Sequence, residues 1–175
     1  MSKAKSDSTV LLGLPPVLDA CCGSRKFWFD QKDPRTLYID QRHEEKTVSD
    51  PSKPDGMRRV VVNPDVVADF RNLPFADESF ALVVFDPPHV KANRTGKDSR
   101  TAINYGTLGF GWKSDLAAGF RECFRVLKTD GVLVFKWAET NIKLNEVLAL
   151  APQRPLFGNR MPKVSGTHWI VFIKA

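Results

Sequence analysis

The stretch VVFDPPHVK, residues 83–91, combines groups that could hold a substrate amine. Pro87 and Pro88 fix two successive φ angles and remove two backbone donors, which leaves nearby carbonyl oxygens free to accept hydrogen bonds. Asp86 adds a carboxylate beside the Pro87 carbonyl. Two acceptors at a rigid corner suit a nitrogen with two N–H bonds, such as the exocyclic amine of a base. The alternative interpretation is a plain strand end followed by a rigid turn.

Four apolar runs along the chain each end on an acidic residue. Continuous apolar strands are typical of sheets covered on both faces. Their separation by helices and loops predicts an α/β fold with a doubly wound, mostly parallel Rossmann-like sheet, in which ligands bind outside the carboxyl ends of the strands. The acids therefore predict a lined crevice, formed by Asp19, Asp40, Asp69 and Asp86.

Three of these strand ends suit parts of a nucleotide-like ligand. The turn after Asp19 contains Gly23 but lacks the full G-x-G-x-x-G pattern, so it fits a ligand without a pyrophosphate better than NAD. Asp40 follows about 20 residues later, where an acid binds the ribose hydroxyls in nucleotide-binding sheets. Asp69 could accept from an adenine amino group while Phe70 covers the ring. Each acid could instead be an ordinary strand-end or loop residue.

The chain length of 175 residues suits one domain with a single core. We expect a flexible tail over residues 1–14 and a single domain over residues 15–175. Residues 90–113 lack a sustained period, which predicts a mobile substrate loop, and a helix should follow with Ser114 as its N-cap. The predicted strands cover residues 17–20, 36–40, 79–86, 131–139 and 167–175, with one or two short strands in 59–70 and a short helix in 141–150.

The predicted loop combines cations with aromatic rings. Cations could bind phosphates, and exposed rings could stack on unpaired bases. The candidate phosphate contacts are Lys91, Arg94 and Arg100, and the candidate stacking residues are Tyr105, Phe110 and Trp112. The alternative is a solvated, disordered loop.

The composition describes a soluble globular protein. Hydrophobic residues make up 42% and charged residues 26% of the chain, and no apolar run approaches the length of a membrane span. The polar N-terminus has no signal-peptide core, and the three cysteines give neither a disulfide framework nor a zinc spacing. We therefore expect a cytoplasmic protein with reduced thiols and no metal site. The net charge of +6 is compatible with a polyanionic partner.

The motifs LDACCGS, YIDQR, ADF and FDPPH, taken together, resemble the class I S-adenosylmethionine-dependent methyltransferases. More narrowly, they look like the amino-methyltransferases with a (D/N/S)-P-P-aromatic motif, which methylate adenine N6 or cytosine N4 in DNA and related RNA and protein amides. The compact layout is similar to small methyltransferase-like proteins of phages and prophages. The resemblance covers residues 15–140, which is most of the chain.

The resemblance implies S-adenosylmethionine as cofactor and a role for each strand end. Asp19, Ala20 and Gly23 would line its methionine part, Asp40 would hold the ribose hydroxyls, and Asp69 with Phe70 would hold the adenine. The catalytic corner would consist of Asp86, Pro87, Pro88 and His89. The chain departs from the family pattern at two places. The turn after Asp19 has a single glycine, and His89 replaces the usual aromatic residue.

The expected activity is methyl transfer to an exocyclic amine of a nucleic-acid base. Adenine N6 in DNA is the preferred expectation for the methyl acceptor, ahead of a base in RNA. Such a base must leave its stack or be single-stranded to reach the pocket. A separate target-recognition domain does not fit in this length, so strong sequence specificity would need a homodimer, a partner or a minimal reading loop. The alternatives are a protein-amide or small-molecule methyltransferase and a non-catalytic S-adenosylmethionine-binding protein.

Overall fold

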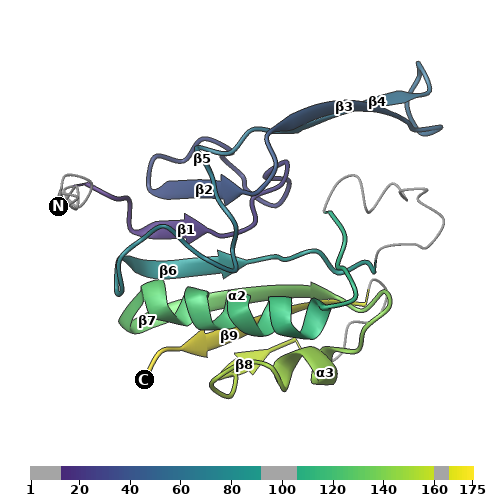
Figure 1. Ribbon diagram of the computed structural model, residues 1–175. Helices are drawn as coiled ribbons and strands as arrows, with labels where there is room; N and C mark the ends of the chain where they lie inside the picture. The colour runs from purple at the N-terminus through teal and green to yellow at the C-terminus, as the bar shows by residue number, and fades with distance from the viewer. Residues whose placement is uncertain (1–12, 92–105, 160–165) are drawn as a thin grey trace, which may run out of the picture.

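A seven-stranded, mostly parallel sheet forms the centre of the protein (Figure 1). The computed structural model describes residues 13–91, 106–159 and 166–175. The strands of this sheet are β1 (Val17–Asp19), β2 (Thr36–Asp40), β5 (Val66–Val67), β6 (Phe80–Phe85), β7 (Leu127–Ala138), β8 (Phe157–Gly158) and β9 (Thr167–Ile173). They lie in the order β5-β2-β1-β6-β7-β9-β8, and β9 runs antiparallel to both of its neighbours.

The predicted α/β class with a mostly parallel, Rossmann-like sheet is confirmed. β1 pairs in parallel with β2 on one side and with β6 on the other. The described part of the chain contains the helices α2 (Trp112–Val126) and α3 (Leu144–Leu148). Every residue between β1 and β2 is described, and this connection consists of turns rather than a helix. Neither described helix has the length and apolar content needed to cross a membrane.

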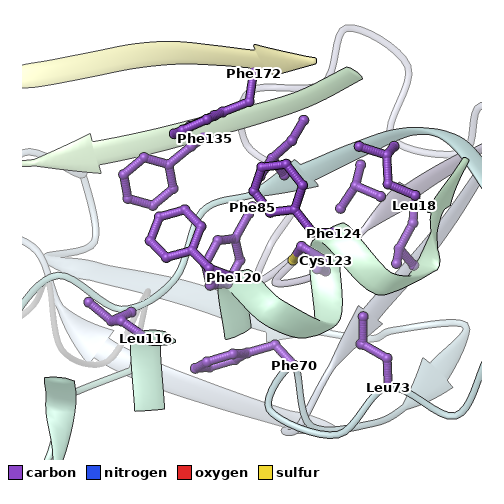
Figure 2. Close-up of a cluster of buried hydrophobic side chains, with 14 of the residues drawn as sticks. Leu18, Phe70, Leu73, Phe85, Leu116, Phe120, Cys123, Phe124, Phe135 and Phe172 are labelled. Carbon is purple, nitrogen blue, oxygen red and sulfur yellow. The ribbon is translucent and has the colours of Figure 1, made fainter. Parts of the chain in front are cut away.

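Helix α2 covers one face of the sheet and encloses an aromatic core (Figure 2). Alternate residues of β7, among them Phe135, are buried on this face. The ring of Phe120 on α2 lies 4.9 Å from that of Phe135 and 5.4 Å from that of Phe85, measured between centroids. Such aromatic pairs add to the stabilisation from apolar burial. They fix α2 against the strands whose carboxyl ends carry the candidate site.

The opposite face is less covered than the apolar strands led us to expect. On β9, the residues Trp169 and Ile173 are 38% and 43% exposed, and Val134 on β7 is only partly buried. The non-helical connection after β1 covers part of this face, because the ring of Phe27 meets that of Trp169 edge-on at 5.5 Å. This irregular connection therefore covers the open face of the sheet less fully than a helix would.

The predicted loop over residues 90–113 ends earlier than expected. Helix α2 begins at Trp112, and its N-cap is Gly111 rather than Ser114. The hydroxyl of Ser114 instead donates back to the Gly111 carbonyl at 2.7 Å, inside the first turn. Lys91 forms a parallel bridge with Leu108, which joins the two described ends of the segment. Residues 92–105 of the predicted loop and 1–12 of the predicted tail lie outside the described residues.

A separate two-stranded hairpin projects from the sheet (Figure 1). It consists of β3 (Glu44–Ser49) and β4 (Met57–Val62), which pair in antiparallel register. The sequence pattern did not predict β3, because that run is polar and charged. In the turn, the buried carboxylate of Asp50 pairs with Arg58 at 2.5 Å.

Gly119 allows α2 to lie close to the sheet. A Cβ at this position would lie 2.6 Å from Cζ of Phe85 and 2.7 Å from Cδ2 of Phe70. We expect Gly119→Ala to lower the free energy of unfolding by about 1–3 kcal/mol, although alanine is the better helix former. Urea unfolding measures the loss, and Ala118→Gly reports the cost of helix propensity for comparison. A Gly119→Ala protein that is more stable than wild type would contradict this packing.

Candidate functional site

A cavity of about 230 Å³ lies at the carboxyl ends of β1, β2 and β6. The sheet order turns here, because β1 is followed by β2 on one side and by β6 on the other. Ligands of open α/β sheets bind at such a switch point. Six of the predicted site residues line this cavity, namely Ala20, Gly23, Asp40, Phe70, Asp86 and Pro88.

Asp40 joins the turn after β1 to the end of β2. Its Oδ2 accepts the backbone N–H of Gly23 at 3.0 Å, so the two predicted cofactor residues are in direct contact. Its Oδ1 accepts from the backbone N–H of Arg42 at 2.9 Å and from Nε of the same residue at 3.0 Å. The buried carboxylate is thus the acceptor around which this part of the cavity is built.

Asp86 is buried at the end of β6, and its two carboxylate oxygens have different surroundings. Oδ2 accepts from Nζ of Lys136 at 2.6 Å. Oδ1 is buried and has no hydrogen-bond partner among the described residues, and the same holds for the hydroxyl of Ser24 in the same cavity. Burial raises the pKa of the Asp86 carboxyl, and the positive charge of Lys136 opposes that rise. Two residues that line one cavity thus each carry a buried polar atom without a partner among the described residues, which favours a ligand that hydrogen-bonds to them.

Asp19 is fully buried beside the cavity rather than in its wall. The indole Nε1 of Trp28 donates to its Oδ2 at 2.7 Å, and the backbone N–H of Cys21 donates to its Oδ1 at 3.2 Å. Burial raises the pKa of the Asp19 carboxyl to about 7, with smaller contributions from the neighbouring acids Asp86 and Asp40. This acid therefore fixes the turn that follows β1.

The remaining residues of the predicted corner are buried around Asp86. Pro88 lines the cavity, whereas Pro87 and His89 are buried and do not. The imidazole of His89 lies edge-on to Trp137, with 6.3 Å between ring centroids. Burial lowers the pKa of His89 to about 4, assisted by the charge of Lys136, so the ring is neutral at pH 7. His89 thus packs behind the corner rather than facing the cavity.

The structure separates the two residues of the predicted adenine site. Phe70 lines the cavity, but Asp69 does not. The carboxylate of Asp69 is held by Arg71, which bonds to it at 2.6 Å and also pairs with Asp115 on α2 at 3.0 Å. This network ties the segment after β5 to the first turn of α2.

The predicted substrate residues lie away from this cavity or outside the described residues. Lys91 and Trp112 line a second cavity of about 240 Å³, together with Leu108, Gly109 and Phe110. The Nζ atoms of Lys91 and Lys113 lie 5.6 Å and 5.5 Å from the ring centroid of Trp112. Trp112 itself is largely buried, whereas Phe110 is 96% exposed. The other predicted substrate residues, Arg94, Arg100 and Tyr105, lie outside the described residues.

Three residues that line the main cavity lie outside the motifs quoted from the sequence, namely Lys26, Phe27 and Lys136. Lys136 comes from β7, and its sequence context assigned it no role even if it faced the crevice. Phe27 and Lys26 come from the irregular connection after β1, where the cluster FWF was the available signal. The other cavity residues lie within the quoted motifs LDACCGS and YIDQR, which did not single them out; they are Cys21, Cys22, Ser24, Gln41 and Arg42. Within the described ranges, no group of three or more His, Cys, Asp or Glu side chains gathers as a metal site.

Comparisons with known proteins relate the chain to solved structures only. No protein-family model matches the chain, and no curated protein matches it either. The PH0226 protein of Pyrococcus horikoshii OT3 superimposes with a TM-score of 0.55 and 17% identity over 91% of this chain and 81% of that chain. The 1,6-didemethyltoxoflavin-N1-methyltransferase of Burkholderia thailandensis superimposes with a TM-score of 0.50 and 13% identity over 91% and 70% of the two chains. At these identities, the comparisons establish a shared fold.

Proposed function

We propose that this protein is an S-adenosylmethionine-dependent methyltransferase that acts on the exocyclic amine of a nucleic-acid base, with adenine N6 in DNA as the first expectation. The observation that carries the proposal is Asp86, which lines the switch-point cavity and whose buried Oδ1 has no hydrogen-bond partner among the described residues. A carboxylate oxygen accepts and cannot donate, so the group that it binds must present a hydrogen.

The corner that holds Asp86 supports an amine as the methyl acceptor. Pro87 and Pro88 follow it directly, so the chain is stiff at this point and the Pro87 carbonyl is a second acceptor. Two acceptors would take both hydrogens of an amine and direct the nitrogen lone pair away from the corner. When bound, the cofactor supplies an activated methyl group, and the protein has chiefly to align the nitrogen for in-line displacement.

The cavity also has groups that fit the cofactor. Asp40 lines it, and ribose hydroxyls would replace hydrogen bonds that its carboxylate now accepts from the Arg42 side chain. Phe70 offers an apolar surface for adenine, and the Ser24 hydroxyl has no hydrogen-bond partner among the described residues. The structure of the Burkholderia thailandensis methyltransferase, which shares this fold, contains bound S-adenosylhomocysteine. That likeness supports the cofactor assignment without specifying the substrate.

The second cavity supports a polynucleotide as the substrate. Lys91 and Lys113 flank Trp112, and Phe110 is exposed beside them. Cations bind phosphates and aromatic side chains stack on unpaired bases, a combination found in proteins that bind single strands. A single-stranded or flipped base would satisfy the access requirement of the main cavity. The expected homodimer and cytoplasmic location stay predictions.

One experiment separates the proposal from its alternatives. The protein is incubated with methyl-labelled cofactor and, in parallel, with single-stranded DNA, duplex DNA, RNA, a protein mixture and nucleosides, and the products are digested and analysed by mass spectrometry. We expect label in N6-methyladenine from DNA. Label in RNA, in a protein amide or in a free nucleoside would replace the substrate assignment. Cofactor binding without any labelled product would favour a non-catalytic binding protein.

A further inference from the structure

Lys136 forms part of the cavity wall directly beside Asp86. The parallel register pairs Phe85 of β6 with Phe135 of β7, which brings the next residue of each strand together. Nζ of Lys136 donates to Oδ2 of Asp86 at 2.6 Å, and the lysine side chain is only 16% exposed. The ammonium also lies 5.5 Å from the ring centroid of Phe27 and 5.8 Å from that of Trp169. These contacts give Lys136 a defined position.

Among the described residues, Lys136 is the cation that pairs directly with the Asp86 carboxylate, whereas Lys26 and Arg42 line other parts of the cavity wall. Asp19 on β1 interacts unfavourably with the Asp86 carboxylate, and the thiol of Cys21 lies in the same acidic surroundings. The imidazole of His89 is neutral at pH 7, because burial and the charge of Lys136 lower its pKa to about 4. Lys136 is therefore the group that favours the ionised form of Asp86 against burial.

We propose that Lys136 is the positioning residue for Asp86 and that it restricts the acceptor site to an uncharged N–H donor; the inference rests on the proposed function. Lys136 binds Oδ2 and so keeps the carboxylate from turning, which leaves Oδ1 for the substrate. An aliphatic ammonium at Oδ1 would place a second cation next to the ammonium of Lys136, and like charges at such short range repel. The exocyclic amine of a base and a carboxamide are uncharged at neutral pH and avoid this repulsion.

The first test measures Asp86 itself and needs no substrate. Lys136→Met keeps an unbranched side chain against Phe27 and Trp169 but removes the charge. The pKa of the Asp86 carboxyl should rise in this variant, because burial then acts without an opposing cation. NMR titration of ¹³C-labelled Asp carboxyls, assigned with Asp86→Asn, measures the change. Lys136→Arg should restore the wild-type value, and Lys128→Met, an exposed lysine on the same strand, should not alter it.

The second test uses the orientation of an amide. In Asp86→Asn, the amide carbonyl should face the ammonium of Lys136, so the NH₂ group faces the substrate N–H and two donors oppose each other. This variant should have very low activity. The double variant Asp86→Asn/Lys136→Met frees the carbonyl to accept from the substrate, and kcat/KM should recover by about tenfold over the single variant. A lysine that is merely structural would give a double variant no better than the single one.

The third comparison concerns the charge of the substrate. Wild-type protein should methylate single-stranded DNA and leave spermidine unmethylated, and Lys136→Met should lower that discrimination. Equal rates on the two substrates in the wild-type protein would overturn the restriction to uncharged donors. An Asp86 pKa that stays constant in Lys136→Met would overturn the positioning role, whatever the protein methylates. If this pKa rises but the wild-type protein methylates no polynucleotide, the proposed function fails and the positioning of Asp86 by Lys136 stands.

Discussion

Asp86→Ala should lower turnover by about a hundredfold or more, because a positioned acceptor for the substrate amine is lost. Binding of S-adenosylhomocysteine should persist, since Asp40 and the Gly23 turn contact each other independently of Asp86. Turnover is measured with labelled cofactor on the best substrate found, and cofactor binding by calorimetry. Asp77→Asn is a matched control, because this carboxylate is exposed, pairs with Arg125 in the last turn of α2 and does not line the cavity.

The stability of the variant decides how its activity is interpreted. Removing Asp86 leaves the mostly buried ammonium of Lys136 without this carboxylate, and an uncompensated buried charge is costly. Asp86→Asn keeps the size of the side chain and an oxygen that accepts from Lys136, so this variant should fold even where the alanine variant fails to fold. A folded asparagine variant with unchanged turnover would show that the corner is a structural turn. His89→Ala, by contrast, should act on stability, because it removes a buried ring packed on Trp137.

The strand-end acids illustrate how much of the site the sequence could predict. Asp40 and Asp86 follow apolar runs, and the carboxyl ends of parallel strands meet at one edge of a sheet, so local pattern alone places them together. Asp69 has the same local pattern, yet it faces Arg71 and α2 instead of the cavity. The difference depends on an ion pair between segments far apart in the chain, which no local spacing encodes.

Lys136 is a site residue that the local sequence pattern could not identify. Its strand was predictable, but its partner follows from the register between β6 and β7, and that register is set by long-range packing. The irregular connection after β1 was equally hidden, because Trp28 reaches Asp19 across nine residues without a helical or strand period. The parts of the site that escaped prediction are those fixed by contacts between elements rather than by the pattern within one.

Asp19 should make the protein less stable as the pH rises from about 4 to about 8. Its pKa is raised from 3.8 to about 7 by burial, so the unfolded chain releases the proton at lower pH than the folded one. A raised folded-state pKa gives a contribution that is fully present below the unfolded value and is lost as pH rises through the folded value. A shift of this size corresponds to about 4 kcal/mol of unfolding free energy.

Asp19→Asn isolates this contribution. The amide cannot ionise, so the stability of the variant relative to wild type should increase by several kcal/mol between pH 4 and pH 8, as determined by urea unfolding at each pH. The free energy of unfolding of the variant at pH 4 should be lower than that of wild type. Trp28 and the Cys21 backbone donate to different oxygens of Asp19, and in the amide one of these oxygens is replaced by an NH₂ group, which cannot accept. Acids with lowered pKa values, such as Asp69, change stability in the opposite direction in both proteins and cancel in the difference. A constant difference between the two proteins across this range would mean that Asp19 is already ionised at pH 4 and that its buried carboxylate is stabilised by Trp28 and the turn.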